Sequence, residues 1–405
     1  MTNVVVVVGG STGGVRSVQA LRRAGFEGRL VLVSDEEHLP YDRPPLSKDL
    51  LAVDSVGTPV SLLSQAEVTE LDVTLRLGCR AVGLDPDAKV LTIERGGQSD
   101  EVPYDAVVIA TGVEARRLSG TDGIAGVHVI RRLEDARELR SLMGPGRKAV
   151  VVGAGFIGAE FASAARAHDM DVTIVEAQPV PLAHILGAEV GAEVASVHVT
   201  HGAELRTGRT VAAVESADGR VTSIRLDDGS ELPADVVVVG IGASPATAWL
   251  ADSGLPIGDG IDCDEDLQVL GFPGVYAVGD VARWPHPAYA APIRIEHWTS
   301  AGDQAQVMAA HVVGRDRPAI ALPYVWSDQY GQRIQIVGRP SEGTASTIHG
   351  AMATSDLVAL YAAPDGRLVG ALVVDNPRLF MQVRKAIAAG TPALEVEQSL
   401  LVTSL

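Results

Sequence analysis

Short apolar runs recur along the chain, and the clearest of them lead into glycine-rich loops. Val4–Val8 is a continuous β-branched run, and Ala149–Val152 is a second run of the same kind. Such unbroken runs are typical of buried parallel strands. The residues after each loop, Val15–Ala24 and Ala159–His168, are predicted to be helices. The pattern predicts an α/β protein in which strands and helices alternate.

The two loops form an internal repeat, because Gly9-Gly10-Ser11-Thr12-Gly13-Gly14 is matched by Gly153-Ala154-Gly155-Phe156-Ile157-Gly158. A further strand follows each helix and leads to acids, Asp35 and Glu36 in the first copy and Glu176 in the second. In such a βαβ unit the glycines permit a tight turn, close approach of a pyrophosphate and packing of the helix on the strand. The acid accepts hydrogen bonds from ribose hydroxyls. Two units predict two dinucleotides, one held permanently and one exchanging.

Ser11 departs from this pattern, since it replaces the middle glycine of the first loop. Its side chain could crowd a pyrophosphate, but Gly13 adds backbone freedom beside it. We therefore expect the first loop to bind its dinucleotide. The alternative is a degenerate domain that binds none.

Later strands extend the two units. Ala106–Gly112 and Val236–Gly242 are matching apolar runs that end in small residues, and we interpret them as crossings between two domains. Gly274–Val278 predicts a further strand that places Gly279 and Asp280 at its carboxyl end. Ligands of open α/β sheets bind at that edge, so these two residues are candidates for the first dinucleotide site.

From about Pro318 the pattern changes to short alternating strands and a helix over Pro377–Ala389, which is typical of a small, mostly antiparallel α+β domain. The expected fold is two Rossmann-like dinucleotide-binding domains plus a C-terminal α+β domain. Residues 1–112 and 243–317 make up the first, discontinuous domain, residues 113–242 the second, and residues 318–405 the third.

Composition and charge narrow the possible functions. The length of 405 residues exceeds what one core usually supports, and the net charge of −18 disfavours nucleic acid and anionic membranes as partners. The two cysteines, Cys79 and Cys263, lie far apart, so we expect no disulfide framework and no metal site. The start lacks a signal-peptide pattern, and no apolar run approaches the ~20 residues of a membrane span. We expect a cytoplasmic protein, monomeric or homodimeric.

Five motifs resemble those of one known family. They are Pro40-Tyr41-Asp42-Arg43-Pro44-Pro45-Leu46-Ser47-Lys48, Ala110-Thr111-Gly112, Val278-Gly279-Asp280, Ile295-Glu296-His297-Trp298 and Trp326-Ser327-Asp328-Gln329-Tyr330. Together with the glycine loops, and over essentially the whole chain, they resemble the FAD-dependent, NADH-specific ferredoxin reductases of bacterial oxygenase systems, the putidaredoxin reductase type. The resemblance implies a glutathione-reductase-like fold, FAD and NADH as cofactors, and a 2Fe–2S ferredoxin as a transient partner.

The resemblance also implies which residues hold the cofactors. The candidates for FAD are Gly9, Ser11, Gly13, Gly14, Asp35, Arg43, Lys48, Val82, Ala110, Thr111, Gly112, Arg131, Gly279, Asp280 and Trp298. The candidates for NADH are Gly153, Gly155, Phe156, Ile157, Gly158, Glu160, Glu176 and Gly242. On this assignment, hydride passes from NADH onto FAD, and single electrons then pass to a ferredoxin that serves an oxygenase.

Lys48, Glu160 and Trp298 are the candidates for catalysis. An ion pair between Lys48 and Glu160 near flavin N5 would stabilise negative charge on the reduced flavin. The alternatives are a structural salt bridge or two solvated charges. Trp298 would line the flavin edge and ease electron exit, or else pack in a core. Phe156 would stack as a gate, or simply pack beside its own helix.

The cofactor preference follows from charge. Glu176 would bond two ribose hydroxyls and repel a 2′-phosphate, and no arginine occurs at positions 177–179 to receive that phosphate. The sequence therefore favours NADH over NADPH. Candidate residues for a ferredoxin-docking patch are Arg294, Arg315, Arg317, Arg333 and Arg339, although each is also explained as a solvated surface charge.

The absence of a cysteine pair after the first glycine loop indicates the route of the electrons. Related disulfide reductases carry a C-x-x-x-x-C pair on the helix after the FAD loop, whereas this stretch contains no cysteine. Electrons would therefore leave the flavin outward, to a carrier. The alternatives are a rubredoxin reductase or NADH oxidase of the same architecture, and a flavin–NADH redox-sensing protein that controls partner binding.

Overall fold

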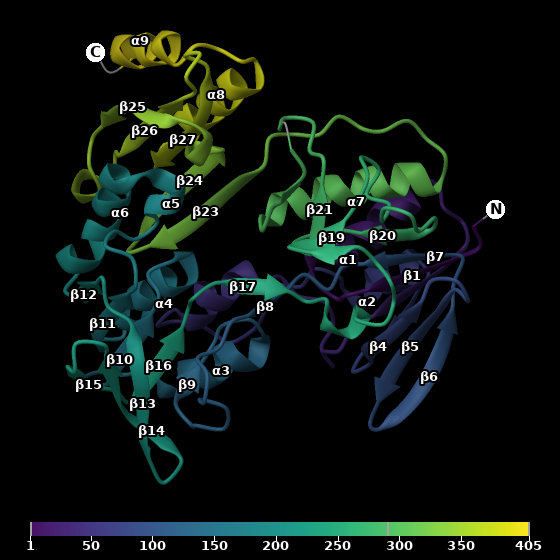
Figure 1. Ribbon diagram of the computed structural model, residues 1–405, viewed down its shortest axis with the longest axis horizontal. Helices are drawn as coiled ribbons and strands as arrows, with labels where there is room; N and C mark the ends of the chain where they lie inside the picture. The colour runs from purple at the N-terminus through teal and green to yellow at the C-terminus, as the bar shows by residue number, and fades with distance from the viewer. Residues whose placement is uncertain (1, 290, 404–405) are drawn as a thin grey trace. The chain divides into compact units, whose positions relative to one another are not determined.

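A computed structural model describes residues 2–289 and 291–403, and Figure 1 labels their helices and strands. These residues form two compact units. The first unit comprises Met1–Arg43, Pro59–Glu114 and Ala243–Pro323, and the second comprises Pro44–Thr58, Ala115–Gly242 and Tyr324–Leu405. Each unit has sheets and a hydrophobic core of its own, so each is described separately.

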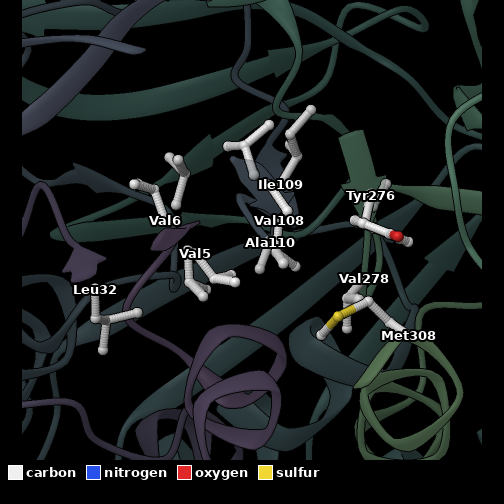
Figure 2. Packing of buried hydrophobic residues seen from close by; sticks show 14 of the residues in the cluster. Val5, Val6, Leu32, Val108, Ile109, Ala110, Tyr276, Val278 and Met308 are labelled. Carbon is white, nitrogen blue, oxygen red and sulfur yellow. The ribbon is translucent and has the colours of Figure 1, made fainter. Parts of the chain in front are cut away.

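The first unit is built on a five-stranded parallel sheet. Its order is β20 (Val275–Ala277), β7 (Ala106–Ile109), β1 (Val4–Val8), β2 (Arg29–Val33) and β3 (Val73–Arg76). Helices α1 (Thr12–Arg23) and α7 (Trp298–Val312) pack against each other on this sheet (Figure 1). Figure 2 shows apolar side chains of β1, β2, β7 and β20 in this core, with Met308 of α7 drawn beside Val278. Burial of both faces explains the unbroken valine runs in these strands.

Smaller elements surround this sheet. They are α2 (Gln65–Glu70), the antiparallel sheet of β4 (Arg80–Asp85), β5 (Val90–Arg95) and β6 (Gln98–Pro103), the one-turn helix η3 (Ala248–Leu250), and the sheet of β18 (Ile257–Gly258), β19 (Gly260–Asp262), β21 (Ala282–Trp284) and β22 (Ile293–Arg294). The chain passes between the units through β8 (Val113–Ala115) and β17 (Ala243–Pro245), which pair with each other.

The second unit repeats the parallel architecture. Its sheet has the order β12 (Glu204–Thr207), β11 (Asp171–Glu176), β10 (Lys148–Val152), β16 (Val236–Val239) and β9 (Val127–His128). Its helices are α3 (Leu133–Leu142), α4 (Phe156–Ala167), α5 (Ala183–Leu186) and α6 (Ala188–Thr200), and a three-stranded sheet consists of β13 (Val211–Ala217), β14 (Arg220–Leu226) and β15 (Glu231–Pro233). The repeat seen in the sequence is thus a repeat of folds, and the α/β prediction is confirmed.

The C-terminal part of the second unit is an antiparallel sheet. Its order is β23 (Tyr324–Gln329), β24 (Gln332–Gly338), β27 (Leu368–Val374), β26 (Val358–Ala362) and β25 (Thr344–His349), and it is accompanied by α8 (Pro377–Ala388), α9 (Ala393–Thr403) and the one-turn helices η4 (Pro340–Glu342) and η5 (Met352–Thr354). Ile334 and Leu372 of this sheet share one core with Leu186 and Val194 of α5 and α6. This shared core explains why residues 113–242 and 318–405, separate domains in the sequence analysis, form one compact unit.

The proline-rich motif packs on the second unit, although the residues before and after residues 44–58 belong to the first unit. Residues 44–58 include η1 (Pro44–Ser47) and η2 (Asp49–Leu51), which lie against α3 and α4. The His168 ring bonds to the Leu51 carbonyl over 2.8 Å. Lys48 therefore belongs to the second unit, whereas the sequence analysis had assigned it to the domain of residues 1–112.

Candidate functional site

The two glycine-rich loops have the same backbone geometry. Gly9 has φ of +124° and Gly153 has φ of +98°, in the region that only glycine adopts freely. A Cβ on Gly14 would lie 1.8 Å from the Gly9 carbonyl oxygen, and one on Gly158 would lie 2.1 Å from that of Gly153. The third glycine is required in both copies, because the helix returns directly onto the strand-ending turn.

Helices α1 and α4 both begin inside these loops, earlier than the sequence had predicted. Their N-caps are Ser11 and Gly155, neither of which caps the helix with its side chain, and the first turn of each lacks an acid. Helix α2 differs, since Ser64 and Glu67 form a capping box there. The N–H groups at the start of α1 and α4 are thus left for another acceptor, which a dinucleotide pyrophosphate fits.

The Ser11 side chain is bonded to Arg43, which is another of the residues predicted to bind FAD. Its hydroxyl accepts a hydrogen bond from Arg43 Nε over 3.1 Å. Arg43 also forms an ion pair of 2.9 Å with Glu36, which in turn accepts a hydrogen bond from Tyr41. Asp35, the predicted ribose ligand, is exposed at the end of β2. Glu36, the second acid after this strand, was not among the predicted site residues.

Further candidates for FAD binding lie at the carboxyl edge of the first sheet. A Cβ on Gly13 would lie 3.3 Å from the Val278 carbonyl oxygen and 3.5 Å from the Ala110 side chain. The N–H of Gly279 donates to Oε1 of Gln304, a fully buried residue of α7, over 2.5 Å. The loop, the β7 turn and the end of β20 therefore meet at one place, and Gln304 fixes their arrangement.

The remaining FAD candidates lie at several places. Trp298 donates from Nε1 to Asp42 over 2.7 Å, and the Arg16 guanidinium lies 5.7 Å from its ring centre. Val82 is half-buried and occupies a bulge in β4.

The other FAD candidates follow the strands of the first sheet or lie in the second unit. The backbone carbonyl of Asp280 accepts a hydrogen bond from Arg294, and the Thr111 hydroxyl donates to the Ala246 carbonyl. Gly112 has a positive φ of +69°, and Arg131 lies in the second unit, where its N–H donates to Asp135.

Lys48 and Glu160 form the expected ion pair, with 2.7 Å between Lys48 Nζ and Glu160 Oε2. The Glu160 side chain is only 2% exposed and that of Lys48 15%. Two hydroxyls complete the shell: Ser47 donates to Oε2 over 2.5 Å, and Ser327 donates to Oε1 over 2.7 Å. Gln329 donates to Ser327 over 3.1 Å. The carboxylate is thus satisfied by one cation and two hydroxyls in a buried position, which excludes the alternative of two solvated charges.

Ser47 and Ser327 were not among the predicted site residues. Both lie in motifs that carried the family resemblance, the proline-rich segment and the Trp326–Tyr330 segment. Their partner, Glu160, is 113 and 167 positions away in the chain. The motifs were the available signal, but no local pattern indicated that the two serines share one carboxylate.

Glu176 ends β11 beside the second loop. Its carboxylate accepts hydrogen bonds from the N–H groups of Ala154 and Gln178, each over 2.8 Å. Phe156 is partly buried against the core shared with the C-terminal sheet, and the neighbouring Ile157 is 42% exposed.

Most of the arginines proposed for docking are paired with acids. Arg294 pairs with Asp259 and Glu296, Arg317 with Glu265 and Asp266, Arg333 with Asp328, and Arg339 with Glu342. Their charges are locally compensated, and the docking patch stays a prediction.

Thiol and metal chemistry find little support. Cys79 and Cys263 are both buried and unlinked, and burial raises the pKa of the Cys263 thiol well above its usual range. A protonated thiol is a poor nucleophile and electron relay. Within the described residues, no group of three or more His, Cys, Asp or Glu side chains is arranged to hold a metal ion. No helix in the described part of the chain is long and apolar enough to cross a membrane.

Known proteins are similar to this chain over most of its length. The family model described as pyridine nucleotide-disulphide oxidoreductase matches residues 3–305, and one described as reductase C-terminal matches residues 324–399. Rhodocoxin reductase of Rhodococcus erythropolis is 34% identical, over 96% of this chain and 90% of that protein. The ferredoxin–NAD(+) reductase component of the p-cumate 2,3-dioxygenase system of Pseudomonas putida is 36% identical, over 84% of this chain and 82% of that protein.

A solved structure agrees with these relatives. The reductase in the covalent putidaredoxin reductase–putidaredoxin complex superposes with a TM-score of 0.90 at 31% identity, over 96% of this chain and 94% of that one. The paired loops, the buried Lys48–Glu160 pair and the C-terminal sheet therefore occur in a chain of known kind. This chain belongs to the pyridine nucleotide-disulphide oxidoreductase family and, within it, to the ferredoxin reductases that use FAD and NADH.

Proposed function

We propose that this chain oxidises NADH and delivers electrons one at a time to a 2Fe–2S ferredoxin that serves an oxygenase. The observation that carries the proposal is the pair of uncapped helix N-termini behind two glycine loops of the same geometry. The scarcity of thiols supports it, because both cysteines are buried and they are not linked to each other. The printed names of the relatives, reductase components of oxygenase systems, point to the same partner class.

Each cradle is assigned one cofactor. Residues 1–112 and 243–317 would hold FAD, residues 113–242 would hold NADH, and residues 318–405 form the C-terminal domain. Gly9, Ser11, Gly13 and Gly14 would receive the FAD pyrophosphate, and Glu176 the adenosine ribose of NADH. Bound FAD supplies the chemistry that turns one hydride into two single electrons. The protein positions the two cofactors and sets the charge around them.

Lys48 is the charged group assigned to the flavin. Its ammonium would stabilise negative charge that develops on reduction, as fixed charges in a dry site do most effectively. Glu160 and its two serines hold that ammonium in one place, since the carboxylate is 2% exposed and bonded on both oxygens. Ser47 and Ser327 are positioning residues, because they act through Glu160.

The test is turnover with defined acceptors. Purified protein should be yellow, and NADH should bleach it. Reduction of a 2Fe–2S ferredoxin should far outpace both oxygen consumption and reduction of a rubredoxin. Faster oxygen consumption would favour an NADH oxidase, and faster rubredoxin reduction a rubredoxin reductase. A long-lived NADH complex with little electron flow to any acceptor would favour the redox-sensing alternative. The proposal places this activity in the cytoplasm, where NADH is available.

A further inference from the structure

We infer that the second cradle contains a closed site for a 2′-phosphate, formed by Arg206 and Arg209 and blocked by Glu176. The inference deepens the proposed function, since it rests on the assignment of NADH to this cradle and concerns which nicotinamide cofactor the cradle accepts. A single change at Glu176 would then admit NADPH, with no arginine added.

The sheet brings the backbone of both arginines beside the end of β11, where Arg206 lies opposite Val175. Strand β12 pairs in parallel with β11, and Thr207 lies opposite Glu176. Beyond the strands, the N–H of Gly208 donates to the Gln178 carbonyl, and the N–H of Arg209 donates to the Glu176 carbonyl, each over 3.1 Å. The sequence shows no arginine at 177–179, but β12 supplies Arg206 and the segment after β12 supplies Arg209.

Both guanidinium groups are occupied by weak surface partners. Arg206 Nε lies 2.8 Å from Glu204, with side chains 33% and 53% exposed. Arg209 Nε lies 2.9 Å from Asp228, with side chains 44% and 35% exposed. Exposed pairs of this kind contribute little to stability. A phosphate dianion offers a stronger and bidentate partner, so exchange of the acid for a phosphate is favourable.

Glu176 is the group that keeps the site closed. Two backbone N–H groups hold its carboxylate in place, from Ala154 in the glycine loop and from Gln178. A carboxylate at this point accepts bonds from ribose hydroxyls but repels a phosphate on the same ribose. Discrimination by a fixed repulsive charge is a common way to reject a close analogue. The arginines alone would favour NADPH, and Glu176 reverses that preference.

Asp228 is a second group that keeps the site closed to a phosphate. Hydrogen bonds from the Ser230 hydroxyl and N–H lower the pKa of Asp228, so it stays ionised at neutral pH and keeps the Arg209 charge compensated. Loss of that carboxylate would leave Arg209 with one acidic partner fewer. It would add to the effect of a Glu176 variant without replacing it.

The test measures binding without redox chemistry. ADP-ribose and 2′-phospho-ADP-ribose, which lack the nicotinamide, are titrated into the full-length FAD-loaded protein by calorimetry. Glu176→Gln keeps a hydrogen-bond acceptor for Ala154, and Glu176→Ala removes it. Both variants should bind the phosphorylated probe roughly tenfold or more tightly than wild type does. Asp228→Asn added to Glu176→Gln should tighten it further, by up to about fivefold.

Arginine variants decide the assignment. In the Glu176→Gln background, Arg209→Ala and Arg206→Ala should each reduce the gain for the phosphorylated probe and leave ADP-ribose binding unchanged. The matched control is Arg225→Ala, whose surface pair with Glu215 in the same unit is similarly exposed. The control should keep the whole gain. Activity with NADPH should rise in parallel with the affinity for the phosphorylated probe.

Two results would overturn the inference. One is ADP-ribose binding without any gain for the phosphorylated probe in both Glu176 variants. The other is a gain that survives loss of both arginines. In either case the proposed function stands if wild type binds ADP-ribose and is bleached by NADH. Failure of wild type to bind ADP-ribose and to bleach would defeat the proposed function itself, and with it the inference.

Discussion

The buried pair of Lys48 and Glu160 allows a quantitative test of the second unit. The perturbation is Lys48→Met, which keeps most of the length of the side chain and removes its charge. Glu160 then remains as a carboxylate in a position that is 2% exposed. Breaking a buried pair by removing one partner typically costs about 3–5 kcal/mol.

The two serines set where the cost falls in that range. Ser47 and Ser327 both continue to donate to Glu160 in the variant, and hydrogen bonds to charged groups contribute about 1.5–3 kcal/mol each. We therefore expect a loss near the lower end, about 3 kcal/mol. Glu160→Gln should cost less, about 1–2 kcal/mol, because Lys48 is 15% exposed and keeps contact with water.

The assay is a double-mutant cycle on the urea unfolding transition of the second unit. Lys48→Met, Glu160→Gln and the double variant are compared with wild type. The coupling energy should be about 2 kcal/mol, since the double variant leaves no buried charge. The control is Arg367→Met, whose pair with Asp365 is 59% and 53% exposed and should contribute under about 1 kcal/mol.

Two outcomes would refute this reasoning. One is a loss in Lys48→Met no larger than that in Arg367→Met. The other is a coupling energy under about 0.5 kcal/mol, which is the scatter expected of independent sites. The functional assignment has its own readout in the midpoint potential of bound FAD. The potential should fall in Lys48→Met, because a positive charge that favours the reduced flavin is lost, and stay unchanged in Arg367→Met.

Further predictions concern acid stability and the glycine loops. Burial lowers the pKa of His198 to about 4. Neutral His198 therefore contributes fully to the free energy of unfolding above pH 6.5, and this contribution is lost as pH falls toward 4. At pH 5 the loss should be about 2 kcal/mol relative to pH 8, and urea titrations should show less of it in His198→Gln than in wild type or in the exposed control His349→Gln. Gly158→Ala should abolish ADP-ribose binding with FAD retained, and Gly14→Ala should give colourless protein, because each Cβ would meet a backbone oxygen.

Elements with an unbroken buried apolar run could be predicted from the sequence, whereas elements supported by distant packing could not. β1 has the bounds predicted for it, since a run of valines buried on both faces has no other reading at that length. Helix α6 had no predicted counterpart. Its sequence, rich in β-branched residues and containing Gly191, has weak helix propensity, and packing of Val190 and Val194 against the C-terminal sheet stabilises it instead. Such support comes from residues far along the chain and leaves no local pattern.

The same distinction holds at the site. Lys48 and Glu160 could be predicted as partners because each follows a recognisable motif. Gln304, which fixes Gly279, and Arg209, which lies beside Glu176, could not. Both are brought into place by the order of helices and strands in the folded unit, and neither lies in a motif of its own. Spacing in the sequence indicates what a loop can bind, whereas selectivity among ligands depends on neighbours that only the sheet supplies.

The two cradles share a backbone geometry, but the charged groups that contact their loops differ in sign. In the first loop Ser11 is bonded to Arg43, a cation close to the start of α1 that also pairs with Glu36 over 2.9 Å. In the second loop the contacting group is Glu176, bonded to the N–H of Ala154. A cation adds to the attraction of a helix N-terminus for a diphosphate, and an acid subtracts from it. The first cradle should therefore keep its cofactor and the second should exchange it. Arg43→Met should make FAD dissociate on gel filtration, while ADP-ribose affinity stays at the wild-type value. FAD retention in that variant would contradict this account of why one nucleotide stays and the other leaves.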